Sequence, residues 1–349
     1  MYLSIPAVFF VPVYYEKENM LNIIIGEFNL NNEFSDRKDI TIGISLPTQR
    51  EEKWIREKDY MEEYSKNKGV KVIIENADTD SNKQALQVDN LISQGIDILI
   101  LAPVDSVAAK DIVEKAHKAG IKVIDYDRLI KNSDVDLLVN FNKTRIGELQ
   151  GKFVTQNVPK GNYIIMSGDP RDDNSYYIKN GAMAYIKPLA DKGEINIIAD
   201  KAVDNWEPQN AFKIVEEALR NNNNKVDAIV APNDATAGAA IEALKKQGLD
   251  GKVVVTGQDG DLAAIQRIIK RTQSMTVLKD TREIVAAAID AAIKLVRGEA
   301  VDTNAKVNNG KIDVPAIIIA PISIDKNNLK SVLIDSGYLK QNEVFEVYR

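Results

Sequence analysis

From Ile40 onward the chain alternates short runs of β-branched residues with helical patterns, and this alternation constrains the fold more than any other feature. Strands that alternate with helices indicate parallel βαβ units. Most of the runs are too apolar to have one face in water, so we expect helices to bury both faces of each sheet. The strands are predicted at residues 39–46, 70–76, 97–103, 122–127, 136–141, 162–168, 195–200, 227–232, 252–257 and 274–279.

The alternation is interrupted near residues 137–146, where a strand passes directly into a new helix, and it then restarts. We therefore predict an α/β fold with two similar doubly wound parallel-sheet lobes, which a chain of 349 residues is long enough to form. The chain is expected to cross a three-strand hinge near Asn142, Lys279 and residue 304. These crossings put residues 39–143 plus 280–304 in the N-terminal lobe and residues 144–279 plus 305–349 in the C-terminal lobe.

Residues 1–38 differ in composition from the rest and are predicted to be an apolar N-terminal segment and a linker. Residues 2–15 are uncharged but shorter than the roughly 20 residues of a spanning helix, and they contain two prolines. No basic residue precedes Lys17, as one would in an ordinary secretory signal. An atypical export or anchoring segment, a cloning remnant and a strand that packs on a partner all remain open.

Composition excludes several classes of function. The net charge of −6 and the pI near 5.2 argue against a nucleic-acid partner, which would require a basic face. The chain has no cysteine, which removes disulfides, thiolate nucleophiles and cysteine-ligated zinc. The same absence excludes a lipid-modified N-terminal cysteine, so we do not expect a lipoprotein.

No motif indicates an enzyme, a cofactor or a metal site. The single histidine, His117, is expected on the solvent face of a helix, and no nucleophile elbow, Walker loop or pair of metal-ligating histidines occurs. Residues 75–89 begin like a calcium loop but have Lys83 and Asp89 where such a loop needs Gly and Glu. A helix N-cap at residues 80–81 is the expected role of that segment.

Polar residues follow two neighbouring strands near the C-terminal end of the pattern. The strand at 227–232 runs into Asn233, which opens a helix of small residues, and the strand at 252–257 is followed by Asp259. Ligands of open α/β sheets bind in the crevice at the carboxyl ends of the strands. We therefore expect Asn233 and Asp259 to line the same crevice.

Similar polar side chains follow strands elsewhere in the chain. Asp127 and Arg128 follow one predicted strand, and Asp172 and Asn174 follow another. A surface ion pair is the alternative for the first two, and a turn with a helix cap is the alternative for the other two. Lys279 ends the last predicted strand, and we add it to the candidate site.

Trp54 and Trp206 are the only tryptophans, and both lie in polar segments that follow strands. Core packing is the default role of an aromatic side chain. Together with the polar candidates, however, two indoles match a neutral ligand with many hydroxyls, because each hydroxyl both donates and accepts hydrogen bonds. A pyranose also presents C–H faces to which an indole can stack. The set therefore predicts recognition of a sugar, with no bond broken.

Over residues 39–344 the chain resembles bacterial periplasmic D-xylose-binding proteins of the ribose-binding type, which have the type I periplasmic binding protein fold. The segments that carry the resemblance are YDRLI, GELQGK, VPKGNY, VDNWEPQNA, NNNNKVDAIVAPNDATAGAAIEAL, GQDGDLAAI, TQSMTV, NNGKIDVP and KNNLK. The first loop departs from the family, and Lys53 stands where the family usually has Arg. The sugar-contacting positions implied by the resemblance are Lys53, Trp54, Arg128, Asp172, Asn174, Trp206, Asn233, Asp259 and Lys279, with Asp127 added beside Arg128.

The resemblance also implies a function and partners. It implies an extracytoplasmic, cell-surface-associated protein whose lobes close over D-xylose by rotation about the hinge. Clostridial relatives hand the xylose signal to a membrane histidine kinase, and the missing anchor cysteine favours such a sensor. The alternative is the substrate-binding subunit of an ABC-type xylose importer, whose partner is a permease. A sugar-responsive repressor and a sugar-modifying enzyme are lesser alternatives.

Overall fold

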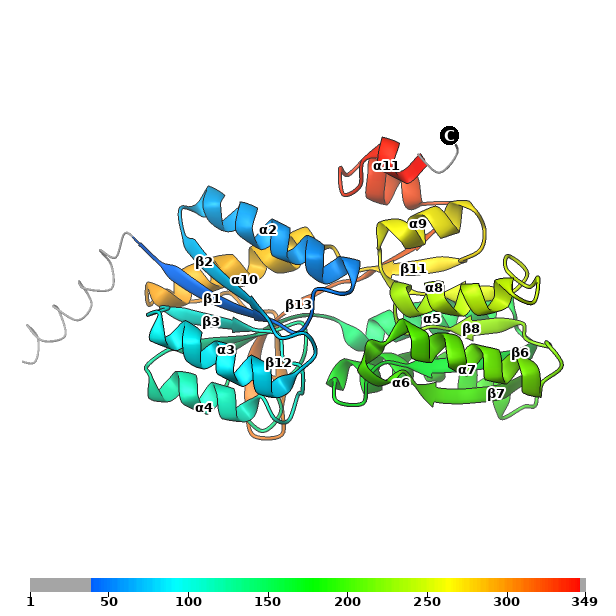
Figure 1. The fold of residues 1–349 in the computed structure, drawn as a ribbon, viewed down its shortest axis with the longest axis horizontal. Coiled ribbons are helices and arrows are strands. Elements are labelled where there is room, and N and C mark those ends of the chain that lie inside the picture. Colours follow the sequence, from blue (N-terminus) through cyan, green and yellow to red (C-terminus); the bar gives the residue numbers. More distant parts are fainter. Residues whose placement is uncertain (1–38, 346–349) are drawn as a thin grey trace, which may run out of the picture.

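The computed structural model describes residues 39–345, which form two α/β lobes lying side by side (Figure 1). The predictions for residues 1–38 lie outside the described residues, as do the last four residues of the predicted C-terminal lobe. Within the described range, no helix is both long and apolar enough to cross a membrane.

The first lobe is built on a seven-stranded sheet with the strand order β12-β13-β5-β4-β3-β1-β2. All of its neighbouring strands are parallel except β12, which pairs antiparallel with β13. Helices α2 and α10 cover one face, and α3 and α4 cover the other. The elements are β1 (Thr41–Leu46), α2 (Glu52–Lys68), β2 (Lys71–Asn76), α3 (Ser81–Ser93), β3 (Ile98–Leu101), α4 (Lys110–Lys118), β4 (Lys122–Tyr126), β5 (Leu137–Phe141), α10 (Thr281–Val296), β12 (Ala305–Asn308) and β13 (Asp313–Ile319).

The second lobe contains a parallel four-stranded sheet with the order β7-β6-β8-β9 and a three-stranded sheet with the order β10-β11-β14. Helices α5 and α6 pack on one face of the larger sheet, and α7 and α8 pack on the other. The elements are α5 (Lys143–Asn157), β6 (Gly161–Ser167), α6 (Asp173–Ala190), β7 (Ile195–Ala202), a 3₁₀ turn (Asp204–Trp206), α7 (Pro208–Asn221), β8 (Ala228–Val230), α8 (Asp234–Lys245), β9 (Val254–Thr256), β10 (Gln258–Asp259), α9 (Leu262–Ile269), β11 (Met275–Leu278), β14 (Ile322–Asp325), a π-helix (Lys330–Ile334) and α11 (Gln341–Phe345).

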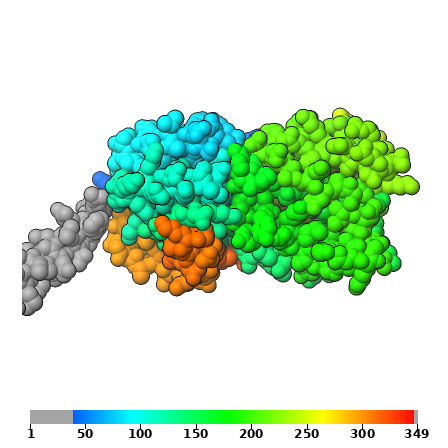
Figure 2. Space-filling model, turned by 90° about the horizontal axis from the view of Figure 1, so that it is seen from below, coloured from blue at the N-terminus to red at the C-terminus, as the bar shows by residue number. Residues whose placement is uncertain are grey.

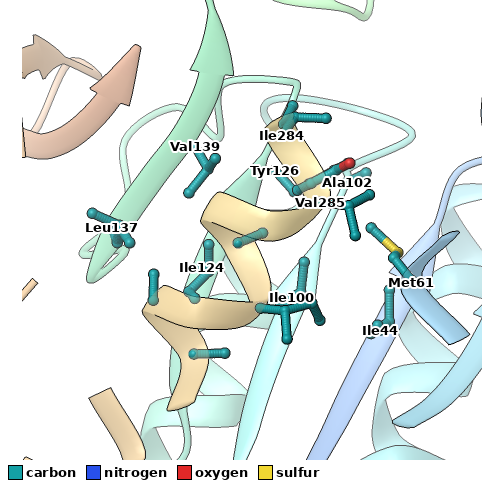
Figure 3. Close-up of a cluster of buried hydrophobic side chains, with 14 of the residues drawn as sticks. Ile44, Met61, Ile100, Ala102, Ile124, Tyr126, Leu137, Val139, Ile284 and Val285 are labelled. Carbon is teal, nitrogen blue, oxygen red and sulfur yellow. The ribbon is translucent and has the colours of Figure 1, made fainter. Parts of the chain in front are cut away.

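The apolar runs explain why helix α10 joins the first lobe although it follows β11 of the second. Its residues Ile284 and Val285 pack among Ile100, Ile124 and Val139 of strands β3, β4 and β5 (Figure 3). These side chains are essentially inaccessible to water. Fully burying one such aliphatic side chain stabilises the fold by about 1.5–3 kcal/mol, so this cluster fixes α10 against the first sheet.

The predicted boundary at residue 304 is wrong. Strands β12 and β13 belong to the first sheet, where Ile317 of β13 pairs with Val139 of β5. Only β14 pairs with the second lobe, antiparallel to β11, so the third crossing lies at residues 320–321. All ten predicted strands are present, but β10, β12, β13 and β14 were not predicted, and the antiparallel β12 and β14 make their sheets mixed.

The other two crossings coincide with helix N-caps. The Asn142 side chain accepts a hydrogen bond from the Arg145 amide at the start of α5, and Asp280 accepts one from the Arg282 amide at the start of α10. A capping side chain satisfies a free amide of the first turn and fixes where the helix begins. The chain therefore changes lobe at defined points, and the two lobes meet along a seam (Figure 2).

Candidate ligand-binding site

A pocket lies between the two lobes at the carboxyl ends of their strands. About 370 Å³ of space free of atoms lies within it, a volume that includes its open mouth. All ten residues predicted from the sequence line it, together with Glu51 and Gln258, which were not predicted. The lining residues are Glu51, Lys53, Trp54, Asp127, Arg128, Asp172, Asn174, Trp206, Asn233, Gln258, Asp259 and Lys279.

The two indoles come from opposite lobes. Trp54 lies in the first turn of α2, where it packs in the core of the first lobe and also lines the pocket. The Lys53 Nζ atom lies 3.4 Å from the centroid of the Trp54 ring. Trp206 lies in the 3₁₀ turn of the second lobe, where its buried Nε1 has no hydrogen-bond partner among the described residues.

Glycine at position 168 allows Trp206 to sit where it does. A Cβ atom added to Gly168 would lie 2.1 Å from Cη2 of the Trp206 ring and 2.6 Å from Ser175 Oγ. Both distances are far below van der Waals contact. The edge of the indole therefore occupies the space that a side chain at Gly168 would fill.

A chain of alternating charges runs across the pocket floor. Lys279 Nζ is 3.1 Å from Asp127 Oδ1 and 3.3 Å from Asp259 Oδ1, and Lys53 Nζ is 3.4 Å from Asp127 Oδ2. Burial by itself would raise the pKa of Asp127, but Lys279, Lys53 and Arg128 outweigh burial and hold that pKa below its usual range. Burial would likewise lower the pKa of Lys279, but Asp127 and Asp259 raise it.

Asp172 and Asn174 have local roles as well as pocket positions. Asp172 is the N-cap of α6, where it accepts a hydrogen bond of 2.9 Å from the Asn174 amide, so the predicted turn-and-cap alternative is also correct. The Asp172 carboxylate is 2.9 Å from Arg128 Nε of the other lobe. The Asn174 amide group donates to the backbone carbonyl of Asp127, also across the lobes.

Asn233 and Asp259 meet in the pocket, as the sequence predicts. Asn233 forms a capping box with Thr236 at the start of α8. Asp259 has a backbone φ of 110°, and Asp127 and Trp206 have φ values of 62° and 54°. A side chain in this region costs on the order of 1–3 kcal/mol, so surrounding contacts must hold these three turns in place.

Asp234 supplies such contacts, and sequence reasoning missed it. It is fully buried, and its Oδ2 accepts hydrogen bonds from the Gly260 amide (3.0 Å), the Asp261 amide (3.1 Å) and the Thr276 hydroxyl (2.8 Å). Burial raises the pKa of Asp234 to about 7, with Arg267 opposing that shift and Asp259 adding to it. The two amides follow Asp259 directly, so Asp234 fixes the turn that carries Asp259.

Glu57 and Gln258 were missed for different reasons. Glu57 is buried one helical turn after Lys53, with its Oε1 2.9 Å from Lys53 Nζ, and the i,i+4 spacing in α2 was the available signal. Gln258 immediately precedes Asp259 in the two-residue strand β10. No signal in the sequence marks that strand, because it pairs only with the distant β11.

The remaining candidates do not form a reaction centre. His117 of α4 is partly exposed, and its Nε2 lies 2.9 Å from Asp136 Oδ2, so it pairs with a carboxylate outside the pocket lining. Asp80 caps α3 by accepting from the Asn82 and Lys83 amides, which confirms the predicted cap. Among residues 39–345, no cluster of three or more His, Asp or Glu side chains is arranged to hold a metal ion.

Contacts between residues outside the pocket lining also join the two lobes. Arg50 is 2.9 Å from Glu207, the Leu262 amide donates to Glu52 (2.7 Å), and the Ser106 amide donates to the Arg171 carbonyl (3.0 Å). Each pair joins one lobe to the other. The fold and the pocket between the lobes together define a two-lobed solute-binding protein, a class in which a small ligand is held between the lobes.

The comparisons with known proteins agree with this class. Residues 42–300 match the periplasmic binding protein domain, and the chain belongs to that family. It is 39% identical over 327 residues to a D-xylose-binding periplasmic protein of Escherichia coli, covering 94% of this chain and 99% of the relative. It is 38% identical over 328 residues to a protein of the same description from Haemophilus influenzae, with coverage of 94% and 99%.

Solved structures give the same result for the fold. A carbohydrate transporter solute-binding protein from Chloroflexus aurantiacus in complex with D-glucose has a TM-score of 0.82 at 32% identity, covering 87% of this chain and 98% of the other. An ABC transporter solute-binding protein from Clostridium phytofermentans with bound β-D-glucose has a TM-score of 0.82 at 30% identity, covering 87% and 99%. The fold is therefore the type I periplasmic binding protein fold, and the relatives are sugar-binding proteins, not enzymes.

Proposed function

We propose that this protein binds D-xylose outside the cytoplasm and closes its two lobes over the sugar. The observation that carries the proposal is the pocket itself, in which two indoles and a set of carboxylate, amide, ammonium and guanidinium groups from both lobes surround one small space. The identity of 38–39% to D-xylose-binding periplasmic proteins supports xylose as the ligand.

The polar groups suit a neutral sugar better than a charged ligand. The acids and bases of the pocket floor already neutralise one another, as the ion pairs of Asp127 with Lys53 and Lys279 illustrate. A sugar hydroxyl can donate to a carboxylate and accept from an ammonium or amide, so it can join this network without adding charge. Because both lobes supply contacts, the ligand would favour the closed arrangement over an open one.

Calorimetric titration of the full chain with D-xylose tests the proposal, with D-glucose and D-ribose as comparison ligands. We expect saturable binding of one xylose per chain, tighter than binding of either comparison sugar. The tryptophan fluorescence should change in parallel, because both tryptophans line the pocket. A chain that retains its fold but shows neither heat nor fluorescence change with xylose would refute the proposal.

We further propose that a membrane partner reads the closed state. The resemblance to clostridial sensors favours a histidine kinase sensor domain as that partner. The second candidate is an ABC permease, and it is favoured by the transporter descriptions of the Chloroflexus and Clostridium structures. Co-purification of the full chain with each membrane partner, with and without xylose, separates the two. Xylose-dependent capture of the kinase domain alone supports sensing, and capture of the permease alone supports import.

A further inference from the structure

Glu51 lines the pocket but is not among the residues predicted to contact the sugar. It is the residue immediately before α2, and its side chain does not cap that helix. Only 6% of the side chain is exposed. Its Oε1 atom is engaged by Arg50, at 2.5 Å from Nη2 and 3.1 Å from Nε.

The second carboxylate oxygen of Glu51, Oε2, differs from Oε1 in its hydrogen bonding. Oε2 is buried and has no hydrogen-bond partner among the residues that the structure describes. A buried acceptor left unsatisfied is costly, and nearly all buried polar atoms in native proteins have a partner. Since Glu51 forms part of the pocket wall, a ligand in the pocket is the natural donor for this atom.

Arg50, the partner of Glu51, reaches across to the other lobe. Its Nη1 donates to Glu207 Oε2 (2.9 Å) and its Nη2 donates to the Asn205 carbonyl (2.7 Å). Asn205 directly precedes Trp206, and both residues have left-handed backbone conformations. The same turn is held within its own lobe by Asp169, which accepts from the Asn205 amide at 2.6 Å. Arg50 therefore connects Glu51 to the turn that carries the pocket's second indole.

We propose that Glu51 is a further ligand-contacting residue, whose Oε2 accepts a hydrogen bond from one sugar hydroxyl, and that Arg50 couples this contact to closure at the Trp206 turn. A carboxylate only accepts hydrogen bonds, so it selects for a hydroxyl donor at one ring position and against a hydrogen or an anion there. The inference rests on the proposed function, because it presumes a polyhydroxylated ligand in the pocket.

The test compares D-xylose with its four monodeoxy analogues, each lacking one hydroxyl, by calorimetry on the full-length wild type and on Glu51→Gln. Hydrogen bonds to charged groups are worth more than neutral ones, so Glu51→Gln should weaken xylose binding by about tenfold. For the analogue that lacks the donating hydroxyl, wild type and variant should bind about equally. Glu51→Ala, which has no acceptor left, should show the same pattern with a larger loss for xylose.

A merely structural role predicts a different pattern. If Glu51 only held Arg50, its replacement would weaken xylose and all four analogues by the same factor, and that result would overturn the proposed contact. Glu52→Gln is the matched control: Glu52 also bridges the lobes, through the Leu262 amide, but it does not line the pocket. It should change all five affinities by a common factor.

Arg50→Met tests the coupling to closure, since it keeps the apolar stem and removes every donor. The dissociation rate of xylose, followed by stopped-flow tryptophan fluorescence, should rise several-fold while the association rate changes less. The losses of xylose-binding free energy caused by Arg50→Met and by Glu51→Gln should be non-additive in the double variant. An unchanged dissociation rate or strictly additive losses of binding free energy would overturn the coupling.

Failure of the proposed function and failure of this inference give different results. If the wild type does not bind xylose, the proposed function is wrong. If the wild type binds xylose but the Glu51 variants weaken xylose and all four analogues equally, only the inference is wrong.

Discussion

Replacing Gly168 with alanine should damage the pocket through the position of Trp206. The added Cβ would lie 2.1 Å from Cη2 of the indole, whereas ordinary contact begins near 3.4 Å. The ring must therefore move by more than about 1 Å, or the β6–α6 loop must move by as much. Ser175 limits that loop movement, because its hydroxyl donates to the Asp169 carbonyl at 2.7 Å.

The expected energies follow from this overlap. Overpacking of a filled site costs about 1–3 kcal/mol, which should appear partly as a lower free energy of unfolding. An indole displaced by about 1 Å also packs less well against a face of the ligand. Each loss of about 1.4 kcal/mol of binding free energy weakens the affinity tenfold. We therefore expect Gly168→Ala to weaken xylose binding by about ten- to a hundredfold and to shift the tryptophan emission of the free protein.

Calorimetric titration with xylose and urea unfolding together measure both effects. Gly43→Ala is the matched control, because its Cβ would lie 2.5 Å from the Ile96 side chain in the core of the first lobe, far from the pocket. The control should lower the free energy of unfolding with little change in affinity. If Gly168→Ala binds xylose as tightly as the wild type, the position of the Trp206 indole beside Gly168 does not determine the affinity.

Two further predictions concern the charged groups of the pocket. The folded-state pKa of Asp127 lies below its ordinary value of 3.8, so its ion pairs stabilise the protein above about pH 4 and are lost as the pH falls through the folded pKa. The free energy of unfolding should therefore decrease less steeply with falling pH for Asp127→Asn than for the wild type. Urea unfolding at several pH values measures this free energy, and the same dependence on pH in both proteins would contradict the assignment. Asp234→Asn should weaken xylose binding by about tenfold through the Asp259 turn, with little further loss in an Asp259→Asn background; additive losses measured by calorimetry would show that Asp234 acts elsewhere.

The polar lining of the pocket could be predicted in part because it follows from strand direction. Asp127, Asp172, Asn233 and Asp259 each come shortly after an apolar run, and the carboxyl ends of parallel strands meet at one edge of a sheet. Two lobes with these edges facing each other bring the four side chains together in the pocket, where the structure has them. The alternation of strands and helices was sufficient to predict this much.

The supporting residues could not be predicted in the same way. Asp234 stabilises the Asp259 turn only because Gly260, Asp261 and Thr276 fold around its carboxylate. The Oε2 atom of Glu51 is buried in a pocket wall, and residues of the second lobe complete that pocket. Asp234 follows the predicted site residue Asn233, and Glu51 precedes α2, but the sequence does not show which groups these carboxylates contact.

The sequence by itself determined the class of fold, the ten strands of its alternating pattern and the polar side chains that border the pocket, because hydrophobic period and strand ends are local properties. The tertiary structure alone decided that residues 305–319 return to the first sheet, that Trp206 rests against Gly168, and that Arg50 links the lobes. Each of these depends on a partner far away in the chain, and a strand or side chain reveals its partner only after the intervening residues have packed.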